Sequence, residues 1–237
     1  PFKQLNEEQK STVTSISERI IDRIANDHSD LLEFIIEGGA GTGKTILAVY
    51  LMKLIADYGS GYTIDDGPDP LAEDNLDFPS VIDRRHLNIG LVIPQASLRD
   101  TIKKVFRSVE GLDASMILSP FDIPKIVLDR SKKFDLLIID EAHRLNRFAA
   151  QANGSLLNQY RQYNKQLYGM DDPEGNHHTQ LDWARDCSKN LILLLDKTQA
   201  VRPADIDSSD WEEAINRAKS ASLHFPLSSQ MRMQVSE

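Results

Sequence analysis

Residues 34–45 read FIIEGGAGTGKT, and this stretch decides the fold. Its first three residues form an apolar run that ends in glycine, which predicts a buried strand followed by a turn. Gly38, four further residues and then Gly43-Lys44-Thr45 satisfy the P-loop pattern, and helical spacing follows from Gly43 to about Tyr58. A chance glycine-rich turn is the alternative, but it would need neither a strand before it nor a helix after it. The segment therefore predicts a nucleotide phosphate site.

Each residue type in this loop has a chemical task. Glycines let successive backbone N–H groups point at phosphate oxygens, and the start of the helix adds positive potential. Lys44 is expected to reach the β- and γ-phosphates of ATP, and the Thr45 hydroxyl is expected to ligate Mg²⁺. The predicted ATP-binding residues of the loop are Gly38, Gly39, Ala40, Gly41, Thr42, Gly43, Lys44 and Thr45.

Short apolar runs recur along the rest of the chain. They lie at residues 89–93, 116–118, 136–139, 191–195 and 223–225. Most lack polar alternation, as expected for strands covered on both faces of a parallel sheet. Helical spacing occurs at residues 6–27, 97–109 and 120–132, and two stretches, about 59–88 and 144–189, are expected to be insertions. This order predicts a three-layer α/β domain with a mostly parallel sheet.

The composition limits the classes of protein to consider. The chain has 237 residues, enough for one large domain with a full core, and its apolar runs, such as Leu191–Leu195, are far too short to cross a bilayer. Cys187 is the only cysteine, so no intrachain disulfide is possible and a cytoplasmic setting is expected. The net charge is −9, but seven acidic residues and no basic ones fall between Ser60 and Asp83, which leaves −9 + 7 = −2 for the rest. The charge therefore does not exclude a nucleic-acid partner.

A second motif, which is acidic, follows another predicted strand. Residues 134–143 read FDLLIIDEAH, an apolar run that continues directly into Asp140 and Glu141. After a P-loop, Asp140 is expected to hold Mg²⁺ through water, and Glu141 to orient or deprotonate the attacking water. Solvated acids at the end of a strand are the alternative.

Several segments carry a resemblance to a known family. DEAH at Asp140–His143 resembles motif II of the helicase superfamilies. The segments that resemble further elements are LDKTQ at 195–199 (superfamily 1 motif III), LSSQMR at 227–232 (motif IV), LNEEQ at 5–9 (the Q motif) and RPAD at 202–205. As a set they resemble the Schlafen group 3-like DNA/RNA helicase domain family, from Gln9 to Arg232 apart from the two insertions.

The resemblance implies roles for individual residues. Gln9 would contact adenine, Gln199 would sense the γ-phosphate and couple it to nucleic-acid binding, and Arg232 would act as an arginine finger in cis. Each has a simpler alternative: a helix capping box with Asn6 for Gln9, a solvated turn for Gln199, and an exposed surface position for Arg232. His143 is either a coupling residue or a locally hydrogen-bonded histidine. The expected catalytic residues are Lys44, Glu141, Gln199 and Arg232, and the expected Mg²⁺ ligands are Thr45 and Asp140.

The resemblance also sets the expected domain organisation. Residues 1–237 are expected to form a single RecA-like P-loop ATPase domain, the first of the two in superfamily 1 enzymes. The second RecA-like domain, with motifs V and VI, is expected to be absent from this chain, so strand separation is not inferred. For the same reason we expect ATP to bind but to be hydrolysed slowly.

Weaker patterns concern nucleic acid and metal. Arg99, Lys103 and Arg107 form a basic stripe at successive i, i+4 positions, beside a segment that in the family touches a nucleic-acid backbone. A solvated helix face is the alternative. The adjacent His177 and His178 could suggest a metal site, but exposed histidines are the simpler interpretation.

Two functions from different classes fit the sequence. The first is an ATP-hydrolysing, Mg²⁺-dependent, helicase-like motor domain acting on single-stranded DNA or RNA. The alternative is an ATP-dependent switch or scaffold in defence or regulation. A small-molecule kinase is disfavoured, because Asp140-Glu141 together with Gln199 suits the activation of water.

Overall fold

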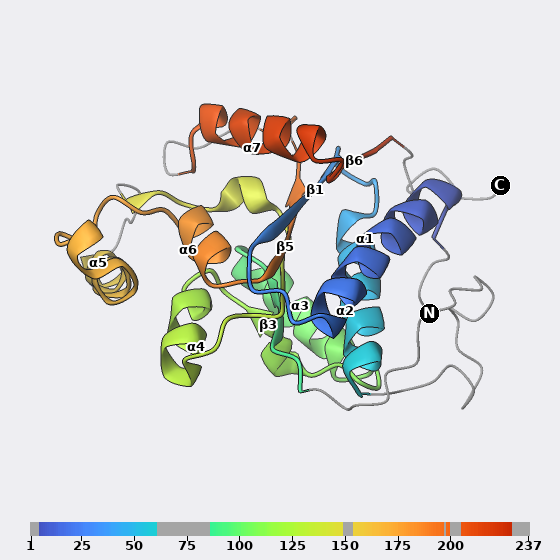
Figure 1. The fold of residues 1–237 in the computed structure, drawn as a ribbon, viewed down its shortest axis with the longest axis horizontal. Helices are drawn as coiled ribbons and strands as arrows, with labels where there is room; N and C mark the ends of the chain where they lie inside the picture. Colours follow the sequence, from blue (N-terminus) through green and yellow to red (C-terminus); the bar gives the residue numbers. More distant parts are fainter. Residues whose placement is uncertain (1–4, 61–85, 149–153, 197, 200–204, 229–237) are drawn as a thin grey trace.

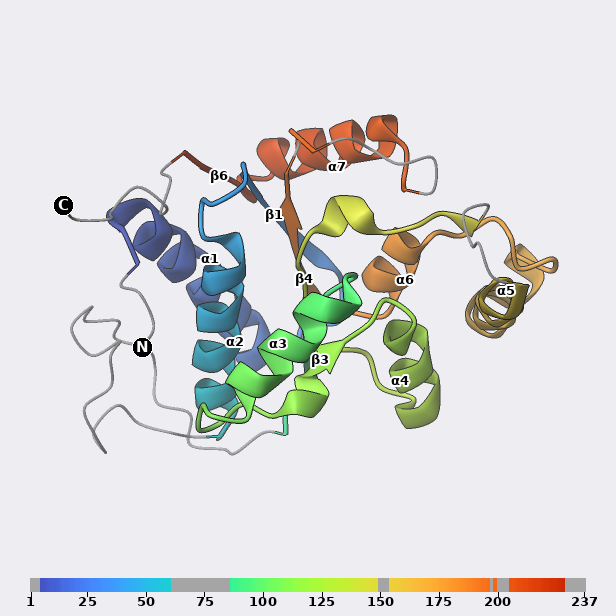
Figure 2. The same cartoon turned by 180° about the vertical axis from the view of Figure 1, so that it is seen from behind.

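A computed structural model describes residues 5–60, 86–148, 154–196, 198–199 and 205–228. These residues form three layers, with a central sheet between two layers of helices (Figures 1 and 2). This arrangement confirms the predicted α/β class. Among the described residues, no helix is both long enough and apolar enough to cross a membrane.

The sheet has six strands in the order β3-β2-β4-β5-β1-β6. Their bounds are Leu32–Gly38 (β1), Ile89–Val92 (β2), Ile117–Leu118 (β3), Leu136–Ile139 (β4), Asn190–Leu195 (β5) and His224–Leu227 (β6). Every pairing between these strands is parallel, as predicted. All residues of β2, β4 and β5 are buried, which explains why their sequences are apolar apart from Asn190 at the start of β5.

Helices cover both faces of the sheet. On one face lie α1 (Glu7–Ala25), α2 (Lys44–Ser60) and α3 (Ala96–Phe106); on the other lie α4 (Asp122–Arg130), α6 (Gln180–Asp186) and α7 (Ser208–Ser220) (Figures 1 and 2). Right-handed crossovers account for this division. The chain steps outward from β1 to β2 to β3, then reverses direction at β4, and the connecting helices change face at that point.

The second insertion contains two helices that the sequence pattern did not predict. α5 (Gly154–Tyr168) and α6 are joined through a 3₁₀ turn at Gly169–Asp171, and α5 lies at the outer end of the molecule (Figure 1). Tyr160 and Trp183, with ring centroids 4.3 Å apart, hold α5 to α6, and Phe121 meets both rings edge-on. The insertion therefore has a small aromatic core of its own. Most of the first insertion lies outside the described residues.

The strand order brings the predicted motifs together. β5 lies between β1 and β4, with Ile36 opposite Leu194 and Ile139 opposite Leu193. Because the strands are parallel, the loops after β1, β4 and β5 leave the sheet at the same edge. The P-loop, the DEAH segment and the LDKTQ segment therefore meet there.

Candidate nucleotide site

The P-loop backbone depends on glycine. Gly41 and Gly43 have φ angles of 85° and 82°, a left-handed conformation that costs other residues about 1–2 kcal/mol. A Cβ atom on Gly38 would lie 2.6 Å from Thr42 Oγ1 and 3.2 Å from the Leu227 Cβ. The loop can therefore close against the end of β6 only with glycine at this position.

Lys44 is buried and lies over its own loop. Its Nζ donates hydrogen bonds to the carbonyl oxygens of Gly38, at 2.6 Å, and Gly39, at 3.0 Å. These charge-assisted contacts hold the ammonium at the loop, where the sequence predicts phosphate.

The two predicted Mg²⁺ ligands are in direct contact. The Thr45 hydroxyl at the start of α2 donates to Asp140 Oδ2 at 2.7 Å, although the residues are 95 positions apart. Asp140 is fully buried at the end of β4; burial raises the pKa of its carboxyl group, and the hydrogen bond from Thr45 opposes that shift. A hydroxyl and a carboxylate oxygen side by side fit Mg²⁺, which takes few protein oxygens and leaves places for water and phosphate.

Glu141 is held in an unusual backbone conformation. Its φ and ψ are 50° and 46°, a left-handed geometry that costs a non-glycine residue of order 1–3 kcal/mol and occurs mainly at functional sites. The bend turns the chain from β4 into a 3₁₀ turn at Ala142–Arg144 and leaves the Glu141 side chain at the cleft. Its Oε2 lies 3.0 Å from His143 Nε2, and this hydrogen bond holds the pKa of the Glu141 carboxyl group below its usual range. The carboxylate is therefore ionised at neutral pH.

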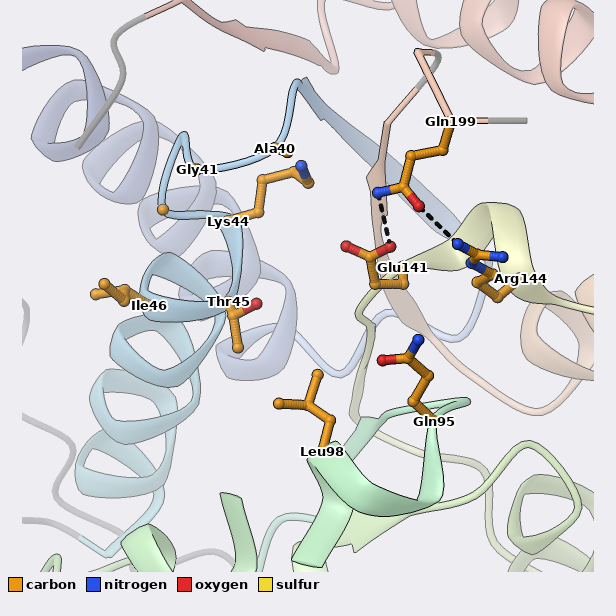
Figure 3. A pocket seen from close by; sticks show the side chains of 11 residues that line it. Ala40, Gly41, Lys44, Thr45, Ile46, Gln95, Leu98, Glu141, Arg144 and Gln199 are labelled. Carbon is orange, nitrogen blue, oxygen red and sulfur yellow. Dashed lines mark hydrogen bonds between the residues drawn. The ribbon is translucent and has the colours of Figure 1, made fainter. Parts of the chain in front are cut away.

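Gln199 joins the DEAH segment and Arg144 to the end of β5. Its Nε2 donates to Glu141 Oε2 at 3.2 Å and to Asp196 Oδ2 at 3.1 Å, and its Oε1 accepts from Arg144 Nη2 at 2.7 Å (Figure 3). Both ends of the amide are thus occupied. The alternative that Gln199 is merely a solvated turn residue does not describe this geometry.

His143 is hydrogen-bonded within the site, and a coupling role for it stays a prediction. The side chain is buried, and its Nε2 contacts both Glu141 Oε2 and, at 3.2 Å, Gln199 Oε1. Both neighbours are acceptors, whereas the buried Nδ1 has no hydrogen-bond partner, so the ring fits the tautomer with hydrogen on Nε2. His143 is locally hydrogen-bonded and also links the DEAH segment to Gln199.

Gln9 completes the capping box of α1 and also contacts the P-loop. Asn6 Oδ1 accepts from the Gln9 N–H, and Gln9 Oε1 accepts from the Asn6 N–H. The remaining amide nitrogen of Gln9 donates to the Thr42 carbonyl oxygen at 2.8 Å. The capping-box geometry is therefore present, and the adenine contact stays a prediction.

A cleft of about 550 Å³ lies between these elements, within the usual size range of small-molecule sites. Lys44, Thr45, Glu141 and Gln199 line it, and the start of α3 closes one side with Gln95 and Leu98 (Figure 3). Arg144 also lines it, although sequence reasoning missed this residue. The only sequence signal for Arg144 was that it directly follows the DEAH segment. The 3₁₀ turn at Ala142–Arg144 is what brings its side chain to the cleft.

Other predicted residues have different outcomes. Arg232 and residues 202–204 lie outside the described residues. Arg99 is half-buried, and its Nη1 donates to the carbonyl oxygens of Ile93 and Pro94. It therefore stabilises the turn between β2 and α3, which is a structural role besides its place in the predicted basic stripe. Lys103 is half-buried and Arg107 is exposed.

The two adjacent histidines make different contacts. His178 stacks on Tyr168, with ring centroids 3.5 Å apart, and contacts the buried Asp172 carboxylate at 3.2 Å. His177 is exposed, as predicted, whereas His178 is half-buried because of these contacts. In the described part of the chain, no three His, Cys, Asp or Glu residues gather to hold a metal ion.

One comparison with known proteins, with a sequence model, identifies the family of the chain. The sequence model of the family described as "Schlafen group 3, DNA/RNA helicase domain" matches residues 33–237. A comparison with curated proteins finds no match. Among solved structures, "Crystal structure of the DnaC helicase loader" is similar at 11% sequence identity and a TM-score of 0.39, covering 96% of this chain and 94% of that one. This structural similarity is distant.

Proposed function

Because the chain belongs to the Schlafen group 3 DNA/RNA helicase domain family, we propose that it binds ATP with Mg²⁺, hydrolyses it, and acts as a helicase-like motor domain on DNA or RNA. The observation that carries the proposal is the 2.7 Å contact between Thr45 Oγ1 and Asp140 Oδ2, with Glu141 as the next residue. This contact between two distant motifs supports the proposal, because magnesium-dependent phosphoryl transfer uses a hydroxyl and a carboxylate at the metal ion.

Nucleotide binding rests on the loop and on Lys44. The backbone from Gly38 to Thr45 would surround the phosphates, and the Lys44 ammonium would exchange the carbonyl oxygens of Gly38 and Gly39 for phosphate oxygens. Phosphate carries full negative charge, so it is the stronger acceptor for this group. Gln9 would support the loop through Thr42, and its amide would have to turn to reach adenine.

Thr45 and Asp140 would hold the metal ion, either directly or through water. Mg²⁺ supplies charge neutralisation on the transferred phosphoryl group and helps to orient it. The Thr45 hydroxyl, which donates to Asp140, would have to turn its lone pairs toward the ion. The raised pKa of the buried Asp140 carboxyl group fits a carboxylate that becomes fully ionised when a cation lies beside it.

Glu141 is the proposed acceptor of the proton of the attacking water. Its Oε2 is occupied by His143 and Gln199, whereas among the described residues nothing donates to its Oε1. One oxygen is therefore held in place and the other is open to the cleft. A carboxylate fixed in this way can orient water without first losing a proton.

Action on nucleic acid is proposed from the family and from the face of α3. Lys103 and Arg107 remain available on this helix, next to the cleft wall formed by Gln95 and Leu98. Phosphate contacts there would give affinity without reading sequence. Gln199 lines the nucleotide cleft just after the end of β5, where it would respond to occupancy of the cleft.

One observation favours the alternative, an ATP-dependent switch. Glu141 and Gln199 are tied to each other and to His143 and Asp196. A network of this kind can respond to nucleotide without fast turnover. An ATPase assay with and without single-stranded DNA and RNA separates the two: stimulation supports the motor, and nucleotide binding with unstimulated turnover supports the switch. Absence of nucleotide binding would contradict both.

A further inference from the structure

Arg144 is a cation at the nucleotide cleft whose position the expected mechanism leaves unexplained. It ends the 3₁₀ turn that follows Glu141, and it lines the cleft together with Lys44 and Gln199. Its Nη2 donates to Gln199 Oε1 at 2.7 Å. Because only the short 3₁₀ turn separates Arg144 from Glu141, a movement of Arg144 also changes the environment of the Glu141 carboxylate.

The guanidinium of Arg144 has no anionic partner in the part of the chain that the structure describes. The acceptor it uses, the Gln199 amide oxygen, is neutral, and its Nε–H is buried without a hydrogen-bond partner. Buried donors without partners are uncommon and call for an explanation. Because hydrogen bonds between guanidinium and phosphate are roughly twice as strong as neutral ones, exchange of Gln199 for a phosphate oxygen is favourable.

The charges around the cleft also require a second cation. Asp140, Glu141 and Asp196 place three carboxyl groups at the ends of β4 and β5, whereas the cleft-lining cations among the described residues are Lys44 and Arg144. Figure 3 shows these two on opposite sides of Glu141. Lys44 belongs to the loop expected to surround the β- and γ-phosphates, so a cation on the far side of Glu141 would lie toward the terminal end of a bound triphosphate.

We propose that Arg144 binds the terminal phosphate of the nucleotide in cis and releases Gln199 when it does so. This inference rests on the proposed function and deepens it, because it assigns to Arg144 the discrimination between nucleoside triphosphate and nucleoside diphosphate. Loss of the Arg144 contact leaves Gln199 Oε1 with its 3.2 Å contact to His143 Nε2, so the amide is held less firmly against Glu141 and Asp196. Arg144 is thus a phosphate-binding residue that also positions Gln199.

Calorimetric titration of ATP and ADP with Mg²⁺ tests the proposal on the full 237-residue chain. All proteins carry Glu141→Gln so that ATP persists during the titration. In this background Arg144→Ala should weaken ATP binding by about tenfold or more, the scale of one lost hydrogen bond to a charged group, and change ADP binding less than about twofold. Arg147→Ala is the matched control: it removes the same charge three residues on, from an arginine paired with Asp207 away from the cleft, and should change neither affinity.

Two conservative variants guard against a folding defect. Arg144→Lys keeps the charge and should retain part of the preference for ATP, whereas Arg144→Gln should lose it. If ATP and ADP affinities fall together, or neither falls, Arg144 only supports Gln199 and the proposal is overturned. If the Glu141→Gln parent binds neither nucleotide, the proposed function itself fails and this inference fails with it. If the parent and its Arg144 variants bind both nucleotides equally well, only this inference fails.

Discussion

Replacing Glu141 with Gln separates chemistry from binding, because the two side chains have the same shape. The Gln amide oxygen can accept the same two hydrogen bonds that Glu141 Oε2 receives from His143, at 3.0 Å, and Gln199, at 3.2 Å. What is lost is the negative charge that strengthens them, worth of order 1 kcal/mol per bond. At about 2–4 °C per kcal/mol for a chain of this size, the melting temperature should fall by less than about 8 °C.

Turnover should respond far more strongly than stability. An amide cannot take a proton from water, so kcat should fall by about 10²-fold or more, equivalent to about 2.7 kcal/mol on the barrier. Phosphate release measures kcat, and calorimetry should show nearly unchanged affinity for ATP with Mg²⁺. Glu212→Gln, at an exposed position on α7, is the control and should leave both quantities unchanged. Hydrolysis at the parental rate by a folded Glu141→Gln variant would refute the reasoning.

Three further predictions follow from particular contacts. Thr45→Val keeps the shape of the side chain but removes the hydroxyl that donates to Asp140. In a metal titration, the Mg²⁺ concentration for half-maximal ATP binding should therefore rise about tenfold. An unchanged concentration would contradict the assignment of Thr45 as a metal ligand. His143→Leu removes the hydrogen bond that lowers the pKa of Glu141, so that pKa should rise and the acid limb of the kcat–pH profile should move to higher pH; an unmoved limb would show that Glu141 is not the titrating group. The double variant Lys103→Glu with Arg107→Glu leaves the structural Arg99 in place and should reduce the slope of log affinity for single strands against log salt concentration by about 1.4. The control is the exposed pair Lys125→Glu with Lys165→Glu, which should leave that slope unchanged. Equal slopes in the two double variants would favour a solvated helix face.

The elements that depend on local pattern were predictable from sequence. The P-loop, the DEAH segment and the buried strands are short runs in which residue type alone determines the local structure. Their bounds shifted by a residue or two where a strand ends in a turn. β6 spans His224–Leu227, whereas the apolar pattern marked residues 223–225, because Pro226 and Leu227 continue the pairing with β1.

What depends on contacts between distant residues could not be predicted. Gln9 meets Thr42 because α1 packs against α2, and no spacing in the sequence encodes that approach. The position of Arg144 depends on the left-handed turn at Glu141 and on Gln199 arriving from the neighbouring strand. α5 was missed because it buries only Tyr160, Tyr163 and Asn164 of its 15 residues, and α6 because it is only 7 residues long, so neither shows a clear apolar periodicity.

The central claim is that the loop from Gly38 to Thr45 binds the phosphates of ATP, and calorimetry of the wild type beside Lys44→Ala tests it most directly. Lys44 is the one loop side chain that carries charge, and it is replaced while the backbone N–H groups of the loop stay in place. The account predicts saturable binding of ATP with Mg²⁺ by the wild type and by the exposed control Lys125→Ala, and at least about tenfold weaker binding by Lys44→Ala. Equal affinity in a Lys44→Ala variant that melts like the wild type, or no binding by the wild type, would contradict it.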